Sequence, residues 1–441
     1  MKIVLISPKG PLYRHRTGIF KKSLRTAPLT LTTLAALVPK ELNAEIEILD
    51  EGVIDIPDTI QADLVGLTVI TGNAPRSYEI AQKIRSSGIP VILGGPHVTL
   101  CPDEAQKYGD SIVTGYAEKS WPQLLRDFNL DKLKSRYDMV NDFTLSNEND
   151  LPYPKRDLLR KLGYKSIHTF EATRGCIHNC NFCVVPTAWG RKPFQKPITH
   201  VIKDIIQMKS KHLVFYDLNL LADFKYAENL FTALIPLKVK WFGLSTTLIY
   251  KNTKLLNLLE KSGCAGLLIG FESLNLNGIS AMNKKFNQPE DFRPLVFELH
   301  KRGIAVNGTF VFGSDNDDKD SFEQVRDFIV ETKMDLPRFS ILTPFPGTPL
   351  FKELEDQGRI TTKDWEKYDG QHIVFSPKNI SSSELLIKHD DLWKQTYSIN
   401  GIMKRFRYNN RGLPLRLAAN IGYRYYANRL NKFYTCMGGS A

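Results

Sequence analysis

Residues 174–186 read RGCIHNCNFCVVP and place Cys176, Cys180 and Cys183 in one short loop. The other three cysteines of the 441-residue chain are dispersed, at positions 101, 264 and 436. Three thiols cannot form a disulfide network, and a structural zinc ion needs a fourth ligand. His178 is the candidate fourth ligand for zinc, although its place between the cysteines would strain the loop. The alternative is an iron-sulfur cluster.

The spacing of the three cysteines, C-x3-C-x2-C, suits a cubane cluster. Three thiolates can hold three irons of a 4Fe-4S cluster and leave the fourth iron open for a non-protein ligand. An open metal position is typical of a catalytic site rather than a structural one. A ferredoxin-like electron carrier normally supplies four cysteines for each cluster, so it fits this loop poorly. The loop therefore favours a catalytic cluster.

The cysteine loop follows the first of six predicted strands, which alternate with five predicted helices. The strands are expected at residues 168–173, 212–217, 239–245, 266–271, 306–312 and 338–343. Repeated strand-helix units with right-handed crossovers predict a partial (β/α)6 TIM-like barrel over residues 165–350. The functional face of such a barrel lies at the carboxyl ends of its strands, where the cysteine loop is expected.

Residues 1–130 predict a separate α/β domain. Short apolar runs at residues 2–6, 45–49, 64–69, 91–93 and 111–115 alternate with helical patterns. Such alternation predicts a Rossmann-like open parallel sheet with its ligand site at the carboxyl ends of the strands. No G-x-G-x-x-G follows the first strand, so the dinucleotide-binding fingerprint is absent. Residues 131–164 are expected to be a linker.

Residues 351–441 are expected to form a mainly helical C-terminal region that ends in a basic, aromatic tail. The net charge of the chain is +12, and residues 401–441 contain eight Lys or Arg and no acid. Such a tail can bind an anionic membrane, an acidic partner or RNA, or it can be a solvated helix packed on the domain. No secretory signal or membrane-spanning run is visible, so we expect a cytoplasmic protein, with the tail offering peripheral membrane contact.

The segment from Cys176 to Cys183, with Phe182 before the last cysteine, resembles the C-x3-C-x-aromatic-C signature of radical S-adenosylmethionine enzymes. The resemblance implies that S-adenosylmethionine chelates the open iron of the 4Fe-4S cluster and is cleaved to a 5′-deoxyadenosyl radical. It also implies that Phe182 lies beside this cofactor. A reductant such as flavodoxin or ferredoxin would supply the electron.

Three further strand ends resemble segments of the same enzymes that contact S-adenosylmethionine. Leu218 replaces the second acid of an F-x-D-D-x-F segment, which leaves fewer polar groups for the ammonium of the cofactor. The implied contacts are Asp217 and Asn219 with the ammonium, Glu272 and Ser273 with the ribose or methionine part, and Asn307 and Gly308 with the adenine.

The first domain resembles the cobalamin-binding domain that precedes many radical S-adenosylmethionine barrels. The resemblance rests on Val91 to Thr99 and Gly115 to Trp121. A D-x-H-x-x-G motif is absent, so no histidine is expected to coordinate cobalt, and His97 is expected to be a loop residue. The implied cobalamin contacts are Thr68, Thr71, Gly94, Gly95, Pro96, His97 and Glu118.

The pairing of these two domains implies cobalamin-mediated methyl transfer to an unactivated carbon. Residues 364–377 are similar to a segment of the hopanoid-methylase-like branch, so we expect the chain to be a class B methylase nearest to that branch. This resemblance favours a hydrophobic small molecule or a lipid as substrate. One alternative is a radical cyclisation, coupling or rearrangement without methyl transfer. Another is an RNA-binding protein with a structural metal, although nucleic acid is not the expected partner. A methylthiotransferase would need a second three-cysteine site, which the dispersed cysteines do not offer.

Overall fold

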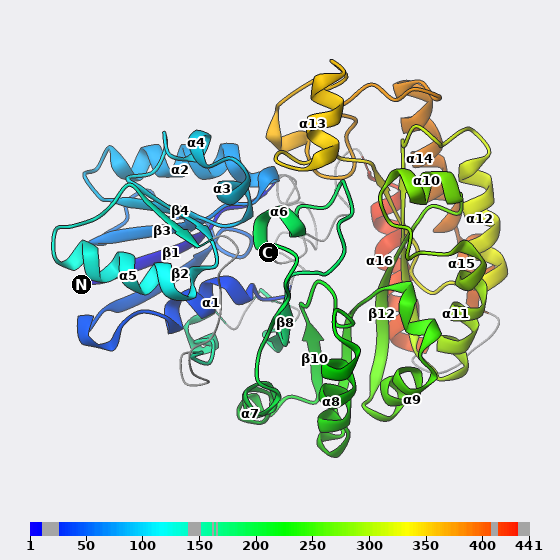
Figure 1. Ribbon diagram of the computed structural model, residues 1–441, viewed down its shortest axis with the longest axis horizontal. Helices are drawn as coiled ribbons and strands as arrows, with labels where there is room; N and C mark the ends of the chain where they lie inside the picture. Colours follow the sequence, from blue (N-terminus) through cyan, green and yellow to red (C-terminus); the bar gives the residue numbers. More distant parts are fainter. Residues whose placement is uncertain (11–25, 140–150, 161–162, 165, 407–412, 431–441) are drawn as a thin grey trace.

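A computed structural model describes residues 1–10, 26–139, 151–160, 163–164, 166–406 and 413–430 of the chain. Two six-stranded parallel sheets stand side by side, each flanked by helices (Figure 1). Helices α14 (Ser382–Thr396), α15 (Ile399–Phe406) and α16 (Leu413–Ala427) lie beside the second sheet, on the side away from the first (Figure 1). The predicted fold class is confirmed.

The first sheet has the strand order β2-β1-β3-β4-β5-β6, with every neighbouring pair parallel. Its strands are β1 (Lys2–Ser7), β2 (Glu45–Asp50), β3 (Leu64–Thr68), β4 (Val91–Gly94), β5 (Ser111–Gly115) and β6 (Arg136–Met139). The chain adds β2 on one side of β1 and β3 on the other. Ligands of open α/β sheets bind at such a switch point, beyond the carboxyl ends of the strands.

Five helices flank this sheet: α1 (Leu29–Ala36), α2 (Ala74–Arg85), α3 (Pro96–Leu100), α4 (Pro102–Ala105) and α5 (Ala117–Asn129). The central strands are apolar on both faces because helices cover both sides. Strand β6 lies inside the segment that we expected to be a linker, and its Tyr137 is buried in the same core as Trp121. The first sheet therefore extends past residue 130.

The second sheet has the order β14-β13-β12-β11-β10-β7 and is also parallel throughout. Its strands are β7 (Thr169–Phe170), β10 (His212–Phe215), β11 (Lys240–Ser245), β12 (Cys264–Glu272), β13 (Ala305–Phe312) and β14 (Arg338–Ile341). The connecting helices are α7 (Ile198–Met208), α8 (Phe224–Leu234), α9 (Thr253–Lys261), α11 (Pro289–Lys301) and α12 (Ser321–Thr332). Six strands alternate with five helices, which confirms the predicted partial barrel.

Shorter elements decorate the barrel. The hairpin of β8 (Thr173–Arg174) and β9 (Phe194–Gln195) brackets the cysteine loop and α6 (Val185–Trp189), while α10 (Leu276–Ala281) follows β12. In Figure 1, β8 and α6 lie at the border between the two sheets. The cysteine loop is thereby placed where the two domains meet.

The C-terminal region contains α13 (Pro349–Asp356), α14 (Ser382–Thr396), α15 (Ile399–Phe406) and α16 (Leu413–Ala427). Arg405, only 1% exposed, clamps this region to the barrel. Its guanidinium donates to the carbonyls of Met334, Asp335 and Thr396 and to Asn420 Oδ1, at 2.9–3.0 Å. Part of the basic tail is therefore structural. Residues 407–412 and 431–441, which carry Arg407, Arg411 and Lys432, lie outside the described residues.

The Arg405 clamp gives a testable prediction. Arg405→Ala leaves four buried acceptors without their charged donor, and we expect it to destabilise the packing of α15 and α16 by about 3 kcal/mol. Thermal unfolding followed by circular dichroism and limited proteolysis after α14 measure this loss. The matched control is Lys404→Ala, because Lys404 is the exposed neighbour of Arg405. Equal unfolding midpoints and digestion rates for the two variants would contradict the clamp.

Candidate active site

The cysteine loop is fastened to the turn that follows α10. The Asn181 amide N–H donates to the Met282 carbonyl at 3.2 Å, and its side chain donates to the Ala281 carbonyl at 2.8 Å. The Asn283 side chain donates to the Asn179 carbonyl at 2.7 Å. These bonds join segments about a hundred residues apart in the sequence, so the loop is held by the barrel rather than by its own sequence.

The three thiols lie at different depths. Cys180 is buried, while Cys176 and Cys183 are half-buried. Burial raises the pKa of the Cys180 thiol to about 11 and of the Cys183 thiol to about 12. Among the described residues, no three His, Cys, Asp or Glu side chains converge on one metal ion. A cubane cluster does not require the three thiolates to meet at one metal ion, because each thiolate binds a different iron.

His178 does not face the thiols as a fourth ligand would. Its ring stacks on Phe286, with ring centroids 3.7 Å apart. Burial lowers the pKa of His178 to about 4, and the charge of Lys284 acts in the same direction. The stacked ring explains why a histidine lies between the cysteines.

Asp217 binds the backbone immediately before the cysteine loop. It is fully buried at the end of β10, and its carboxylate accepts hydrogen bonds from the backbone N–H groups of Ala172 and Thr173 and from the Thr173 hydroxyl. Burial raises its pKa to about 7, and the nearby Glu171 carboxylate adds to the rise. The resemblance implied that this carboxylate meets the ammonium of S-adenosylmethionine. In the structure it faces the backbone before the loop instead.

Asn219 reaches the cysteine loop directly. Its side-chain N–H donates to Cys176 Sγ at 3.5 Å, and its Oδ1 accepts from the Leu221 N–H at 3.1 Å. Phe182 lies on the other side, partly buried against Leu342 and Phe375. Hydrogen bonds to a cluster-ligating sulfur adjust the reduction potential of the cluster. Asn219 is placed to act in this way through Cys176.

The end of β12 is bent so that Glu272 turns inward. The pairing of β12 with β13 shifts by one residue between Gly270 and Glu272, and Glu272 has a φ of 65°. Its carboxylate meets Lys284 Nζ at 2.5 Å, and that ammonium also donates to the Gly270 carbonyl at 3.0 Å. Bulges of this kind re-aim side chains beside active sites. Lys284 was not predicted as a site residue, because nothing in the sequence around it indicates that its partner is Glu272, twelve residues earlier.

The two residues expected near adenine point in opposite directions along β13. Asn307 faces the barrel interior, and its buried Oδ1 has no hydrogen-bond partner among the described residues. Gly308 faces the helices instead, since a Cβ there would lie 2.3 Å from Met334 Sδ. Asn307 therefore has an acceptor to offer a ligand, whereas Gly308 provides space for packing.

A cavity of about 1190 Å³, including its open mouth, lies between the first sheet and the barrel. The first domain contributes the predicted residues Thr68, Gly94, Gly95, Pro96 and Glu118. The barrel contributes Glu171, Thr173, Arg174, Trp189, Tyr216 and Leu218. Leu5 of β1 and Gly66 of β3 line its floor, so the cavity opens at the switch point of the sheet.

Gly95 is required at the cavity rim. It has a φ of 107°, and a Cβ there would lie 2.8 Å from the Val69 carbonyl oxygen. Only glycine adopts this conformation beside the backbone without strain. The loop after β4 can therefore pack closely against the Val69 backbone at the end of β3 without closing the cavity.

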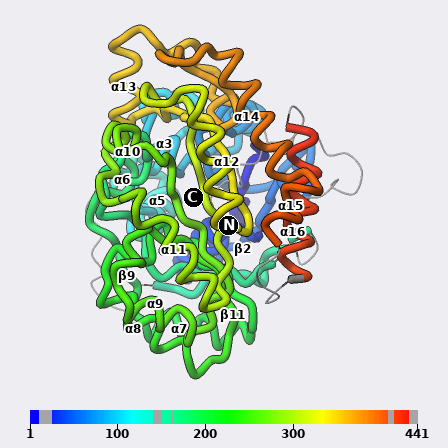
Figure 2. The backbone as a smooth tube through the Cα atoms, turned by 90° about the vertical axis from the view of Figure 1, so that its right-hand side faces the viewer, coloured from blue at the N-terminus to red at the C-terminus, as the bar shows by residue number. Residues whose placement is uncertain are grey.

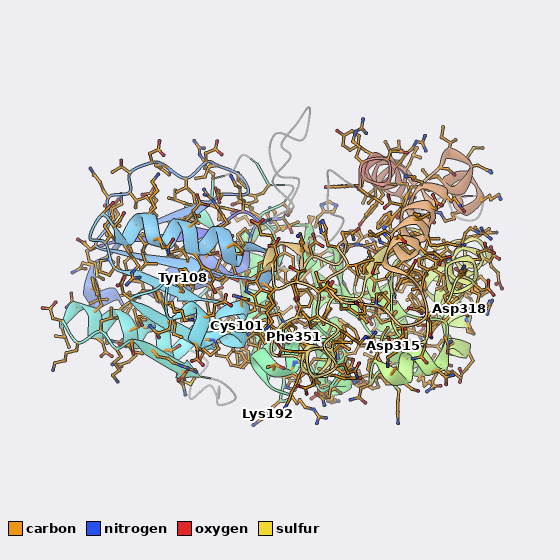
Figure 3. The ribbon with its side chains drawn as sticks, turned by 90° about the horizontal axis from the view of Figure 1, so that it is seen from above. Cys101, Tyr108, Lys192, Asp315, Asp318 and Phe351 are labelled. Atoms are coloured by element: carbon orange, nitrogen blue, oxygen red, sulfur yellow. The ribbon has the colours of Figure 1, made fainter. Side chains whose placement is uncertain are left out.

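Two of the residues expected to bind cobalamin do not line the cavity. His97 is fully buried and bonds with Thr71 Oγ1 and Glu104 Oε1, both at 3.3 Å. Glu104 also accepts from Trp365 Nε1 at 3.1 Å, which joins the first domain to the C-terminal region. In Figure 3, Cys101 and Phe351 are labelled on the two sides of this junction. The assignment of Thr71 and His97 as cobalamin contacts is therefore not supported, and both residues serve domain docking.

Charged side chains connect the two domains inside the cavity. Arg174 Nη1 donates to Glu118 Oε1 at 2.7 Å, and Nη2 donates to Glu171 Oε1 at 2.8 Å. Burial alone would raise the pKa of Glu171, but Arg174 and Lys196 lower it to about 2. The other oxygen of Glu118 is buried without a partner among the described residues. The cavity thus keeps one acceptor for a ligand beside the ion pairs.

A cobalamin-type sheet facing a barrel with a three-cysteine loop defines a radical S-adenosylmethionine enzyme with a B12 domain. Residues 23–125 match the B12 binding domain family, and residues 170–329 match the radical SAM superfamily. A bacteriochlorophyllide d C-12(1)-methyltransferase from Chlorobaculum tepidum is 33% identical over 94% of this chain and 90% of its own. The chain belongs to the cobalamin-dependent radical S-adenosylmethionine methyltransferases.

Further relatives correct the expected branch. A bacteriochlorophyllide d C-8(2)-methyltransferase from the same organism is 31% identical over 90% of this chain and 91% of its own. A hopanoid C-2 methylase from Rhodopseudomonas palustris is 25% identical over 86% of this chain and 73% of its own. The expectation that the hopanoid branch lies nearest is therefore wrong, because both bacteriochlorophyllide enzymes are more similar.

Solved structures share the fold. The radical S-adenosylmethionine methyltransferase TsrM from Kitasatospora setae, with cobalamin and a 4Fe-4S cluster bound, superposes with a TM-score of 0.64 at 18% identity over 81% of this chain and 78% of its own. The cobalamin-dependent radical enzyme OxsB gives 0.68 at 15% identity over 98% of this chain and 72% of its own. The enzyme uses a 4Fe-4S cluster, S-adenosylmethionine and cobalamin, and the three thiols and the cavity between the domains fit these cofactors.

The support from Asp217 can be tested by removing its carboxylate. Asp217→Ala leaves two buried N–H groups of the strand before the loop unpaired, at a cost of about 2 kcal/mol. We expect less iron and sulfide per chain after anaerobic reconstitution, and faster loss of the cluster to a chelator. The control is Asp223→Ala, because Asp223 also accepts backbone N–H groups, at the start of α8. Full cluster content in Asp217→Ala would show that the loop does not depend on this carboxylate.

Proposed function

We propose that the enzyme methylates a carbon of a bacteriochlorophyllide-like tetrapyrrole. The observation that carries this proposal is similarity over nearly the whole chain to two methyltransferases named for bacteriochlorophyllide d, at 33% and 31% identity. The hydrophobic substrate expected from the sequence is of the same chemical kind. A flavodoxin- or ferredoxin-type reductant supplies the electron in this proposal.

The cavity between the domains supports a flat apolar substrate together with the corrin. Leucines of α1 and β1 and the aromatic rings of Trp121, Trp189 and Tyr216 dominate its walls. Its charged members are Arg174, Glu118 and Glu171. Apolar pockets with a few convergent polar groups are typical of cofactor and substrate sites. The cysteine loop begins two residues after Arg174, so the cluster site and the cavity are adjacent.

Cobalamin supplies a transferable methyl group, and S-adenosylmethionine with the cluster supplies a radical that removes hydrogen from the substrate. The role of the chain is placement. In this proposal Cys176, Cys180 and Cys183 bind the cluster, and Lys284 and Glu272 offer opposite charges to the amino acid part of S-adenosylmethionine. Asn307 offers its unpaired carbonyl oxygen to the adenine. Glu118 and the glycines of the β4 loop face the cobalamin.

Anaerobic turnover tests the proposed function. The reconstituted enzyme is given a reductant, bacteriochlorophyllide d and S-adenosylmethionine labelled in its methyl group, and the products are analysed by mass spectrometry. The proposal predicts a tetrapyrrole that has gained one labelled methyl group, together with 5′-deoxyadenosine. Cys183→Ala should form neither. Production of 5′-deoxyadenosine without any labelled tetrapyrrole would overturn the substrate while leaving the radical chemistry intact.

Lys284 gives a test of the S-adenosylmethionine site. Lys284→Met removes the buried ammonium while keeping the length of the side chain, and we expect affinity for S-adenosylmethionine to fall by about tenfold or more. Equilibrium dialysis of the reconstituted protein measures this, with iron content confirming that the cluster is present. Lys285→Met is the control, because Lys285 is exposed. Unchanged affinity in Lys284→Met would remove Lys284 from the site.

Gly94 gives a test of the cobalamin site. Gly94 lines the cavity on the same face of β4 as Ile92, and a Cβ there would make only ordinary contacts, at 3.7 Å from Val113. Gly94→Leu therefore adds a side chain to the cavity, and we expect loss of bound corrin in optical spectra at unchanged iron content. Gly422→Leu is the volume-matched control, because its added side chain meets open space on α16. Equal corrin binding in both variants would place the cobalamin elsewhere.

A further inference from the structure

Helix α16 packs with its polar side inward. Arg416 pairs with Asp335 at 2.5 Å, and the Asn420 side chain donates to the Asp335 carbonyl at 3.1 Å. One turn further on, Arg424 donates to the Tyr397 carbonyl at 3.1 Å. A surface helix normally buries its apolar stripe and exposes its polar one. Helix α16 buries these polar side chains beside Tyr423 and Ala427, which pack on the barrel core, and still leaves apolar side chains on its outer face. That outer face needs another explanation.

The outer face of α16 carries no charge over about two turns. Leu415, Leu417 and Ile421 are 64%, 43% and 57% exposed. Pro414 and Ala418, which neighbour them in the sequence, are exposed as well. Arg429 stacks over Tyr425 at 4.0 Å and places a cation at the C-terminal end of this face.

Exposed apolar side chains also occur on α14 and α15, and α14 contacts both α15 and α16. Fourteen large apolar side chains are exposed among the described residues, and half of them lie on α14, α15 and α16. We call these seven the C-terminal apolar face: Leu386, Ile387, Ile399, Met403, Leu415, Leu417 and Ile421. Helices α15 and α16 run along one edge of the molecule (Figure 2). An apolar surface of this kind marks an interaction site.

Two partners could cover the C-terminal apolar face, a membrane or a second copy of the chain, and the charge around the face favours the membrane. Residues 401–441 contain eight Lys or Arg and no acid. Arg405, Arg416 and Arg424 bond inward, whereas Lys404 and Arg429 are exposed. A two-fold dimer would press this cationic rim against an identical one. The three acids of α14 do not reverse the charge, because Glu384 pairs with Lys319, Asp390 pairs with Lys394, and the charge of Asp391 is offset by Lys388 on the same helix. Anionic lipid headgroups supply the complementary charge.

We propose that the C-terminal apolar face docks the enzyme on an anionic lipid membrane. No helix among the described residues is long and apolar enough to cross a membrane. The apolar side chains of α14, α15 and α16 enter the boundary between headgroups and acyl chains, while Lys404 and Arg429 meet the headgroups. The cavity between the two sheets remains outside this contact, because the face lies on the far side of the barrel.

Vesicle sedimentation of the full reconstituted chain tests the docking. The probes are vesicles of phosphatidylcholine alone and of phosphatidylcholine mixed with phosphatidylglycerol. The expected result is binding to the mixed vesicles that weakens as salt is raised, and weaker binding to the neutral ones. Leu417→Ser/Ile421→Ser should lower the partition coefficient on mixed vesicles by about tenfold or more, because two half-inserted aliphatic side chains are lost.

The control is Leu130→Ser/Ile206→Ser, which removes two aliphatic side chains of similar exposure, 61% and 56%, from the end of α5 and from α7. This variant should bind like the wild type, and all three proteins should unfold at the same temperature. Absence of wild-type binding to mixed vesicles overturns the proposal, as does equal binding by both variants. A wild-type dimer that Leu417→Ser/Ile421→Ser converts to monomer, without vesicle binding, would assign the face to a second copy and overturn it too.

Discussion

A buried ion pair between Glu118 and Arg174 fixes the relation between the two cofactor domains. Glu118 begins α5 of the first domain, and Arg174 stands two residues before the first cluster cysteine. The short contact between these buried groups, 2.7 Å from Arg174 Nη1 to Glu118 Oε1, sets the orientation of α5 relative to the strand that leads into the cysteine loop. The cavity, the cysteine loop and the sheet edge that faces them depend on this contact for their mutual position.

The chemistry of the family needs such rigidity. A radical formed at the cluster site must meet the substrate before it meets solvent, and the methyl group must approach the same carbon from the first domain. The chain meets these demands by packing rather than by acid-base groups. Asp217 shapes the backbone before the loop, the turn after α10 fastens the loop, and the junction of Trp365 with Glu104 closes the far side of the first domain.

Most of the architecture was predictable because strand periodicity and the cysteine spacing are local signals. Contacts across long stretches of sequence were not predictable. Lys284 meets Glu272 only because a bulge bends β12, and Asp217 turned out to face backbone N–H groups that no motif marks. Strand β6 was hidden because only one of its residues is buried. The tail was expected to be surface charge, but Arg405 is among the largest fully buried side chains.

The central claim is that the cluster and the cobalamin face one cavity in a single chain. Electron paramagnetic resonance of the anaerobic holoenzyme tests it directly, because the reduced 4Fe-4S cluster and cob(II)alamin each carry an unpaired electron. The account predicts that reduction of the cluster splits or broadens the cob(II)alamin signal through magnetic coupling between the two centres. Two signals that add without any change in shape or relaxation would place the cofactors apart and contradict the account.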